Sequence, residues 1–419
     1  MSKQHQIVII GGGTAGIMTA AQLLRKDKSL DIAIVEPSEY HYYQAAWTLV
    51  GAGTYDYKKT KKSMKSVIPK GVTWIQDYAT GFMPESNAIS TKKSGEINYD
   101  YLVVAPGLVM DNSLIEGLQE AFDQGLACSN YVDPDKTWEL LKKFKGGNAI
   151  FTQPATPIKC GGAPQKTAYL SADYFKKRKI LDKTNVVFAT PGSVIFGIKP
   201  IRETLTKVLD RYDIDFKPFH APHKIDVAKK RVHFKYVGKD SMPEIDSNNY
   251  LGAEKVDDQT VSIPFDFLHL APPQTAPKFI KESALANDAG WLAVDQYSLQ
   301  HQKYPNIFGL GDVAGLPTAK TGAAVRKQVP VVVDHLMSLV KKQQQSDKSY
   351  NGYSSCPLVT GYGKMVLAEF DYDGNFIPDP KLKQMLIFDS SKEHWRLWML
   401  KKYGLPYLYW NKMVKGLEV

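Results

Sequence analysis

The sequence predicts an α/β protein with two Rossmann-like domains, followed by a C-terminal region of different character. Three observations indicate this architecture. The chain has 419 residues, which is enough for two or three domains. Apolar strand patterns alternate with helical patterns at the N-terminus, and the alternation restarts near residue 149. Residues 346–419 are instead rich in aromatic residues and lysine.

Composition excludes several protein classes. Apolar residues make up 43% and charged residues 23% of the chain, so wholly disordered, collagen-like and coiled-coil chains are excluded. The net charge of +10 favours anionic partners, such as nucleic acid, acidic lipid headgroups or small anions. Three cysteines are too few for a disulfide scaffold, and neither they nor the histidines have the spacing of a metal site.

The N-terminus has the pattern of one βαβ unit, with strands over 6–10 and 32–35 and a helix over 17–24. Residues 4–24 carry no formal charge and are long enough to cross a bilayer. Their glycines make a poor continuous helix, and no basic segment leads into an apolar core. We therefore expect neither a transmembrane span nor a signal peptide here.

A glycine-rich turn joins the first strand to the helix. In the pattern Gly-x-Gly-x-x-Gly, the glycines permit a tight turn, close approach of a pyrophosphate and close packing of helix on strand. The helix N-terminus favours an anion, and an acid about 20 residues further on can accept ribose hydroxyls. The predicted dinucleotide-binding residues are Gly11, Gly13, Thr14, Ala15, Gly16 and Glu36.

Two later segments belong to the same predicted domain. A strand over 101–104 runs into Ala105-Pro106-Gly107, and residues 304–339 give a strand, Gly311-Asp312, a loop and a long helix. Within them, residues 99–107 and 306–312 resemble two further signatures of flavoproteins that have two dinucleotide-binding domains. The resemblance implies FAD as the cofactor, with Gly107 and Gly311 in its site and Asp312 on its ribityl chain. Lys320 lies where a cation could stabilise the negative charge of a reduced flavin.

The second α/β pattern has strands over 149–152, 185–189 and 231–237 and helices over 165–177 and 201–212. The first strand runs into a segment with two prolines and a cysteine, where a phosphate-binding glycine turn would lie in an NADH site. Proline removes backbone N–H donors, and the next strand ends in Thr190-Pro191-Gly192 with no acid for a ribose. Binding of NADH is therefore disfavoured.

Two cysteines lie in distinctive segments, Thr156-Pro157-Ile158-Lys159-Cys160-Gly161-Gly162-Ala163-Pro164-Gln165 and Ser355-Cys356-Pro357-Leu358-Val359-Thr360-Gly361-Tyr362. Together with 316–321, 367–371 and 407–411, they resemble the sulfide:quinone oxidoreductases, and most closely the mitochondrial-type branch, over nearly the whole chain. The resemblance implies that sulfide attacks a Cys160/Cys356 redox centre, giving persulfide or polysulfide, and that two electrons pass through FAD to a membrane quinone.

Some features of this centre stay open. Lys159 and the N-terminus of the following helix could lower the pKa of the Cys160 thiol. The sequence does not show which cysteine receives the sulfane sulfur, what Cys128 does, or whether FAD is covalently bound. The sulfane-sulfur acceptor and the quinone type are not specified either, and a homo-oligomer is compatible with the sequence.

The C-terminal residues 392–419 combine Lys and Arg with Trp and Tyr. Such rings favour the lipid headgroup level, and lysines are attracted to anionic lipid. We expect a peripheral, monotopic region that lies on the bilayer surface and admits the quinone. The alternative is an amphipathic helix pair packed on the core or at a dimer interface.

These expectations divide the chain into four segments. Residues 1–111 and 288–345 form two parts of an FAD-binding domain, 112–287 form a second Rossmann-like domain carrying Cys160, and 346–419 form a quinone and membrane-association region carrying Cys356. Three other functions remain as alternatives. They are a type II NADH:quinone oxidoreductase, the flavin subunit of a flavocytochrome c sulfide dehydrogenase, and a basic FAD-containing protein that binds nucleic acid. No nucleic-acid-binding motif supports the last one, so we expect no nucleic acid partner.

Overall fold

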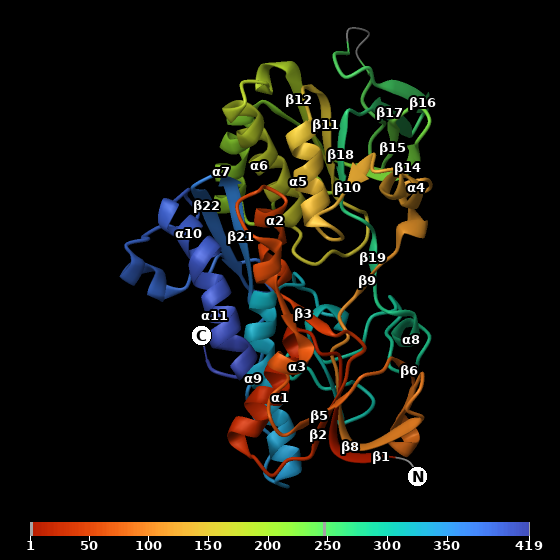
Figure 1. Cartoon of the computed structure of the whole chain (residues 1–419), viewed down its shortest axis with the longest axis vertical. Helices are drawn as coiled ribbons and strands as arrows, with labels where there is room; N and C mark the ends of the chain where they lie inside the picture. The colour runs from red at the N-terminus through yellow and green to blue at the C-terminus, as the bar shows by residue number, and fades with distance from the viewer. Residues whose placement is uncertain (1–2, 246–248, 419) are drawn as a thin grey trace.

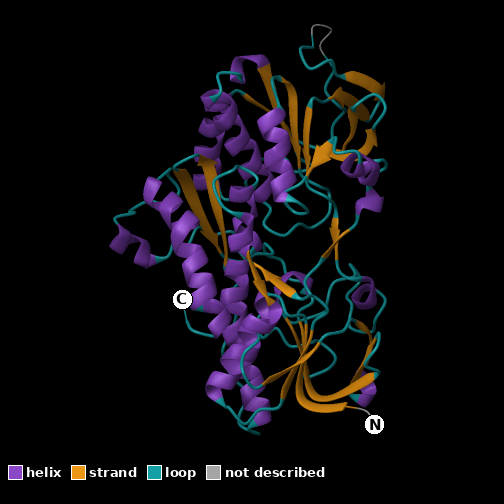
Figure 2. Ribbon diagram, in the orientation of Figure 1, coloured by secondary structure: helices purple, strands orange, loops and turns teal. Residues whose placement is uncertain are grey.

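The structure is a computed structural model that describes residues 3–245 and 249–418. Two α/β units lie one above the other along the long axis, and the C-terminal strands and helices run along one side of both (Figure 1). Sheets in both units are covered by helices, while a separate small sheet lies at one corner (Figure 2).

The N-terminal unit contains a mixed sheet with the order β5-β2-β1-β8-β7-β6, and β20 is added beside β8. The apolar strand β2 is buried along its whole length, as expected for a parallel strand covered on both faces. Since β20 comes from late in the chain, this unit combines two separated stretches of sequence. The strands are β1 (Lys3–Ile10), β2 (Ile32–Val35), β5 (Val72–Ile75), β6 (Ala79–Met83), β7 (Ala88–Thr91), β8 (Glu96–Val104) and β20 (Ile307–Gly309).

Two long helices pack together against this sheet. Helix α1 (Thr14–Lys26) begins directly after Gly13, within the glycine motif and three residues before the expected start. Helix α9 (Gly322–Val340) contributes an apolar face to the same core. The shorter elements nearby are β3 (Tyr40–Tyr42), α2 (Trp47–Val50), β4 (Lys61–Ser63), α3 (Met64–Val67), β9 (Val109–Met110), β19 (Gln274–Thr275) and α8 (Lys278–Lys281).

The second unit contains a parallel sheet with the order β10-β18-β11-β12-β13. Its helix α7 buries apolar residues three and four positions apart, which is the spacing of one helical face. The parallel elements are β10 (Ala127–Cys128), α5 (Pro134–Lys143), β11 (Gly147–Thr152), α6 (Ala163–Lys177), β12 (Thr184–Ala189), α7 (Lys199–Tyr212), β13 (Ile214–Lys217) and β18 (Phe267–Leu270). Beside them lie α4 (Leu118–Asp123) and an antiparallel sheet of β14 (His220–Asp226), β15 (Arg231–Tyr236), β16 (Glu254–Asp257) and β17 (Thr260–Pro264).

The C-terminal region begins with an antiparallel hairpin of β21 (Ser354–Gly361) and β22 (Lys364–Phe370), which the sequence analysis did not anticipate. Its apolar face joins the core of the second unit, where Leu358 and Val366 pack with residues of α6 and α7. After the hairpin come α10 (Trp395–Met399), a π-helical turn (Leu400–Gly404), α11 (Leu405–Asn411) and a 3₁₀ turn (Met413–Lys415).

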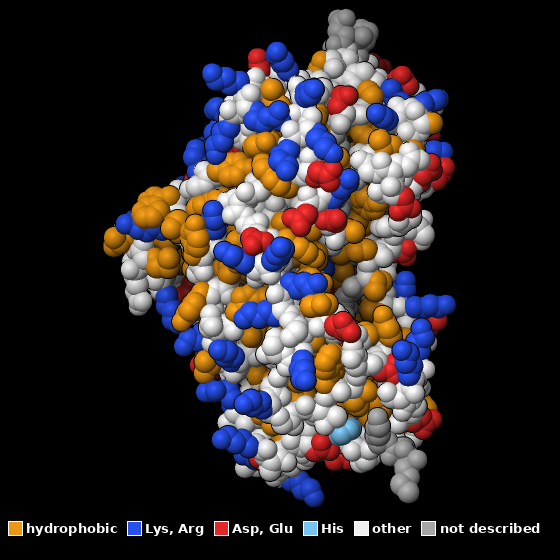
Figure 3. All heavy atoms as spheres, in the orientation of Figure 1, with side chains coloured by type: hydrophobic (Ala, Val, Ile, Leu, Met, Phe, Trp, Pro, Cys, Tyr) orange, Lys and Arg blue, Asp and Glu red, His pale blue; other side chains and the backbone are white. Residues whose placement is uncertain are grey.

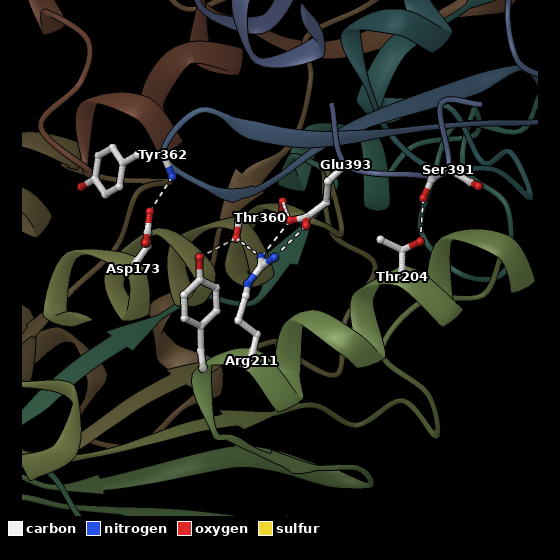
Figure 4. A network of polar contacts seen from close by, with 8 residues as sticks. Asp173, Thr204, Arg211, Thr360, Tyr362, Ser391 and Glu393 are labelled. Carbon is white, nitrogen blue, oxygen red and sulfur yellow. Dashed lines mark hydrogen bonds and ion pairs between the residues drawn. The ribbon is translucent and has the colours of Figure 1, made fainter. Parts of the chain in front are cut away.

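Polar contacts fix this hairpin onto the second unit (Figure 4). The Arg211 guanidinium of α7 makes a bidentate ion pair with Glu393, at 2.6 and 2.8 Å, and also donates to the Thr360 carbonyl at 3.0 Å. On the neighbouring helix α6, the Asp173 carboxylate accepts the backbone N–H of Tyr362 at 2.8 Å. The hairpin that carries Cys356 is therefore held in a fixed position against α6.

Candidate active site

The glycine-rich turn has the shape of a phosphate-binding turn. A Cβ atom on Gly11, whose φ is +101°, would lie 2.3 Å from the Ala105 carbonyl oxygen, and one on Gly16 would lie 1.9 Å from the Gly11 carbonyl oxygen. These two glycines therefore permit close packing of backbone on backbone. A Cβ on Gly13 would meet no protein atom within 4 Å, and no described side chain caps α1. The N–H groups of this helix end can thus face a ligand.

Glu36 lies at the end of β2, beside this turn. Its carboxylate accepts the backbone N–H groups of Gly12 and Ser38, both at 2.7 Å. Burial raises the pKa of this carboxyl, although the two N–H donors act in the opposite direction. The carboxylate oxygens have remaining lone pairs at the position where a ribose would be bound.

The later motif brings further groups to the same region. Gly311 has a φ of +77°, and its N–H donates to the Gln328 side chain at 2.9 Å. Burial raises the pKa of the adjacent Asp312 carboxyl, while Lys159 and Lys320 lower it. The Lys320 ammonium donates to the Ala314 carbonyl at 2.9 Å, and burial lowers its pKa to about 8.

The chain therefore fits a bound dinucleotide. Gly107, with a φ of +77°, is a second position where an added Cβ would meet no protein atom within 4 Å. An uncapped helix end, two open glycine surfaces and a carboxylate at the end of β2 provide the donors and acceptors that FAD requires. Ala15 is buried, and a Cβ on Gly311 would lie 3.3 Å from the Ala15 methyl carbon, so the Gly311 segment packs against the start of α1.

Cys160 lies in the loop between β11 and α6, in a constrained conformation. Its φ is +50°, which is uncommon for a residue with a side chain and frequent at functional sites. Three hydrogen bonds hold its backbone: its N–H donates to the Lys320 carbonyl at 2.8 Å, and its carbonyl accepts from the Ala163 N–H at 2.7 Å and the Tyr131 hydroxyl at 3.2 Å. The cysteine is thus tied to the segment that carries Asp312.

Cys356 lies on β21 and meets Cys160 through the docking of the hairpin. Both cysteines are free and belong to one apolar cluster, in which they lie close enough to shift each other's pKa. A Cβ on Gly162 would lie only 2.6 Å from the Cys356 Sγ, so this sulfur packs directly over the N-terminal end of α6.

Two buried lysines surround the cysteine pair. The Lys166 ammonium on α6 lies 3.1 Å from the Cys160 Sγ, and Lys401, from the π-helical turn, donates to the Ala45 carbonyl at 2.7 Å. Burial lowers the pKa of Lys401 to about 7, and the positive charge of Lys166 contributes to this shift. Neither ammonium forms an ion pair with a carboxylate among the described residues.

These neighbours set the two thiol pKa values apart. Interaction with the Cys356 thiol and the charge of Lys166 hold the pKa of Cys160 well below its ordinary value, although burial acts in the opposite direction. The same interaction between the two thiols, together with burial, raises the pKa of Cys356. Cys160 is therefore the thiolate of the pair.

The sequence position of Lys159 indicated a cation that could lower the Cys160 pKa, but a different lysine lies against the sulfur. The Lys159 ammonium donates to the Gln44 side chain at 2.5 Å, and Lys166 makes the contact with Cys160. Lys166 lies within a continuous buried stretch of α6, and this burial is known only from the folded structure. No sequence signal marks Lys401 either, one of many lysines near the C-terminus.

Cys128 has a different environment. It lies on β10, and its thiol donates to the Leu268 carbonyl at 3.5 Å. Burial raises its pKa to about 12, so at neutral pH it remains a thiol and is a poor nucleophile. This environment is typical of a buried structural cysteine.

The C-terminal region also reaches the glycine-rich turn. The ring of His41 bonds the Gly12 carbonyl at 2.8 Å through Nδ1 and the Tyr409 hydroxyl at 2.5 Å through Nε2. Because a carbonyl only accepts, Nδ1 carries the proton and Nε2 accepts the Tyr409 O–H. The Tyr409 oxygen can then accept the Thr14 hydroxyl proton, at 2.8 Å. Through these bonds α11 supports the first residue of α1.

The outer side of the C-terminal helices carries large apolar side chains. Within the described residues, none of the helices has the length and hydropathy needed to cross a bilayer. The exposed side chains are Met385, Leu386, Phe388, Trp395, Met399, Tyr403 and Tyr407. Figure 3 shows orange side chains gathered on the protrusion at the left edge, over the position of α10 in Figure 1.

Comparisons with known proteins agree with this geometry. A family profile described as pyridine nucleotide-disulphide oxidoreductase matches residues 5–143. The mitochondrial sulfide:quinone oxidoreductase of Mus musculus is 41% identical over 418 residues, which cover 99% of this chain and 88% of that protein. The crystal structure of the sulfide:quinone oxidoreductase from the bacterium Aquifex aeolicus matches with a TM-score of 0.76 and 20% identity, covering 99% of this chain and 92% of that one. This structural match shows a shared fold.

A type II NADH:quinone oxidoreductase of Staphylococcus aureus is similar over a much shorter region. It is 29% identical over 121 residues, which cover 28% of this chain and 30% of that protein. The sequence similarity to this protein thus extends over a minor part of the chain.

Proposed function

This chain belongs to the sulfide:quinone oxidoreductase family, and on that premise we propose that it oxidises sulfide at Cys160 and Cys356. It is an FAD-dependent oxidoreductase whose electrons pass to a quinone. One observation carries the assignment of the redox centre. Two cysteines from distant parts of the sequence meet at the start of α6, where the Cys356 sulfur packs against Gly162 and the Lys166 ammonium lies 3.1 Å from the Cys160 sulfur.

The pKa difference between the cysteines gives the direction of sulfide attack. In the oxidised enzyme the two sulfurs form a disulfide, and hydrosulfide attacks one of them. A thiol of lower pKa is the better leaving group, so Cys160 leaves as a thiolate and Cys356 receives the new sulfur. The S–S bond between the cysteines breaks, and an S–S bond between Cys356 and the substrate sulfur forms. Lys166 stabilises the departing charge of Cys160.

The cofactor supplies a two-electron acceptor that a quinone can reoxidise. The residues that would hold it are those of the glycine-rich turn, with Glu36 for the ribose and Asp312 for the ribityl chain. Lys320 provides a positive charge near Asp312. The backbone bond from Cys160 to the Lys320 carbonyl keeps the thiolate beside this cofactor site.

The second unit supports sulfide rather than NADH as the electron donor. In an NADH site a short glycine turn would follow β11, but here residues 153–162 fill this place and carry Cys160. After β12 come Thr190, Pro191 and Gly192, and the Thr190 hydroxyl accepts the Gly192 N–H at 3.2 Å. None of these three residues has a carboxylate that could bind a ribose at that strand end.

We also propose that the C-terminal helices bind a bilayer surface, from which the quinone enters. The exposed apolar side chains there, including Trp395, Tyr403 and Tyr407, suit the headgroup level of a membrane. Substitution of Trp395 and Tyr403 by serine should release the protein from membranes. Deletion of the whole tail is a poorer test, because it would also remove Lys401 and Tyr409 from the site.

An anaerobic titration of the purified holoenzyme tests the proposed function. Sulfide should bleach the flavin absorbance, and a soluble quinone should restore it. The variants Cys160→Ser and Cys356→Ser should retain FAD and lose both responses. Bleaching by NADH alone, or full activity in either variant, would refute the proposal.

A further inference from the structure

A cavity of about 620 Å³ opens where the end of α1, the segment after α3 and the C-terminal 3₁₀ turn meet. Its floor is apolar and its rim is basic. The floor includes Leu24, Val67 and Val414, and the rim carries Arg25, Lys28, Lys70 and Lys415. None of the described residues that line it is acidic. The volume is within the range of about 300 to 1,000 Å³ that is typical of small-molecule sites.

The rim charges lack counter-ions. All four basic side chains are exposed, and none of them forms an ion pair with a carboxylate of the described chain. The neighbouring Lys26, by contrast, pairs with Asp334 at 2.6 Å. Like charges gathered around one cavity repel each other, and this repulsion is relieved when an anion binds between them.

The cavity adjoins the apolar surface of the tail. Lys415 lies eight residues after the exposed Tyr407, beyond the end of α11 and in the 3₁₀ turn that follows it. In Figure 3, blue side chains run down the left edge directly below the orange protrusion. Basic and apolar groups therefore share one edge of the molecule, as in a surface that meets both headgroups and acyl chains.

We propose that this cavity binds the headgroup phosphate of an anionic phospholipid when the C-terminal helices lie on a bilayer, an inference that rests on the proposed membrane association. The lysines and Arg25 donate hydrogen bonds to the phosphate oxygens, and the apolar floor contacts the glycerol and the first carbons of the acyl chains. The site selects anionic over zwitterionic lipid, because a choline group would add a further positive charge to the rim.

Flotation of the full-length holoenzyme with vesicles tests the proposal. Phosphatidylcholine vesicles with and without phosphatidylglycerol serve as the two probes. The variant Lys28→Gln/Lys70→Gln/Lys415→Gln should bind the anionic vesicles about a hundredfold less, at about fivefold per charge, and the neutral vesicles equally well. The matched control Lys92→Gln/Lys93→Gln/Lys281→Gln removes exposed charges outside the cavity, near β7 and on α8, and should leave both partitions within about twofold of wild type.

Each outcome decides between explanations. If both triple variants lose the same amount of binding to the anionic vesicles, the effect is one of general charge and the proposal is overturned. If the wild-type protein binds both vesicle types equally well, the proposal is overturned while membrane association stands. No wild-type binding to any vesicle would refute the membrane association itself. Thermal stabilisation by soluble dihexanoyl phosphatidylglycerol, absent in the cavity variant, supports a lipid site. Equal stabilisation by inorganic phosphate would instead identify a free-anion site.

Discussion

Substitution of Gly162 by alanine displaces one sulfur of the redox centre without straining the backbone. Gly162 has φ −83° and ψ −2°, a conformation that alanine adopts readily. The added Cβ would lie 2.6 Å from the Cys356 Sγ and 2.4 Å from a methyl carbon of Leu358. Non-bonded carbon contacts are about 3.5 to 4.0 Å, so the sulfur has to move by about 1 Å.

A shift of this size should reduce the rate of sulfide attack about a hundredfold, because a 1 Å misplacement of a reacting group commonly has that effect. The overpacked core should lose about 1 to 3 kcal/mol of unfolding free energy. The assay is stopped-flow bleaching of the flavin by sulfide, with FAD content and thermal unfolding measured on the same sample. FAD content should stay at the wild-type level, because Gly162 lies outside the glycine-rich turn.

Gly161→Ala is the matched control. A Cβ at Gly161 would have only one neighbour, a methyl carbon of Ile158 at 3.8 Å, which is an ordinary contact. This variant should bleach at the wild-type rate. Equal rates for Gly162→Ala, Gly161→Ala and wild type would refute the placement of the Cys356 sulfur over the end of α6.

Three other perturbations follow from the site. Lys166→Met removes the cation beside Cys160, so the midpoint pH of thiol alkylation should rise by about 1 to 3 units, measured with iodoacetamide on the reduced enzyme. Tyr409→Phe removes the hydroxyl between His41 and the glycine-rich turn and should weaken FAD binding about tenfold in reconstitution of the apoprotein, whereas Tyr407→Phe, at an exposed site, should not. The pKa of Lys401 is lowered in the folded protein, so above about pH 7 the unfolded chain binds more protons at this lysine than the folded chain does. The contribution of Lys401 to the free energy of unfolding therefore rises with pH, by at most about 1.4 kcal/mol per pH unit. Chemical denaturation of Lys401→Met should show a smaller rise in stability between pH 7 and 10 than wild type does.

Each of these has a contradicting outcome. An unchanged alkylation midpoint would show that Lys166 does not stabilise the thiolate. Equal FAD affinities in the two tyrosine variants would separate the tail from the cofactor site. Parallel stability profiles for Lys401→Met and wild type would show that this lysine keeps an ordinary pKa in the folded protein.

The sequence determined the parts of this protein that depend on local pattern. The strand, glycine turn and helix at the N-terminus follow from an apolar run, from glycines that permit close backbone packing and from helical periodicity. The acid at the end of β2 followed from its distance along the chain. The segments around Cys160 and Cys356 carried enough of the family pattern to indicate the chemistry, although they gave no geometry.

Tertiary structure alone decided which charges meet the sulfurs. Lys166 and Lys401 come from different parts of the chain, and only the docking of the C-terminal region on α6 encloses both beside Cys160. The hydrogen bond from Tyr409 to His41 likewise joins residues hundreds of positions apart. Periodicity and turn motifs report interactions between near neighbours in sequence. The pKa of a buried thiol depends on whichever charges the folded chain places within a few ångströms, and that placement is set by the packing of distant segments.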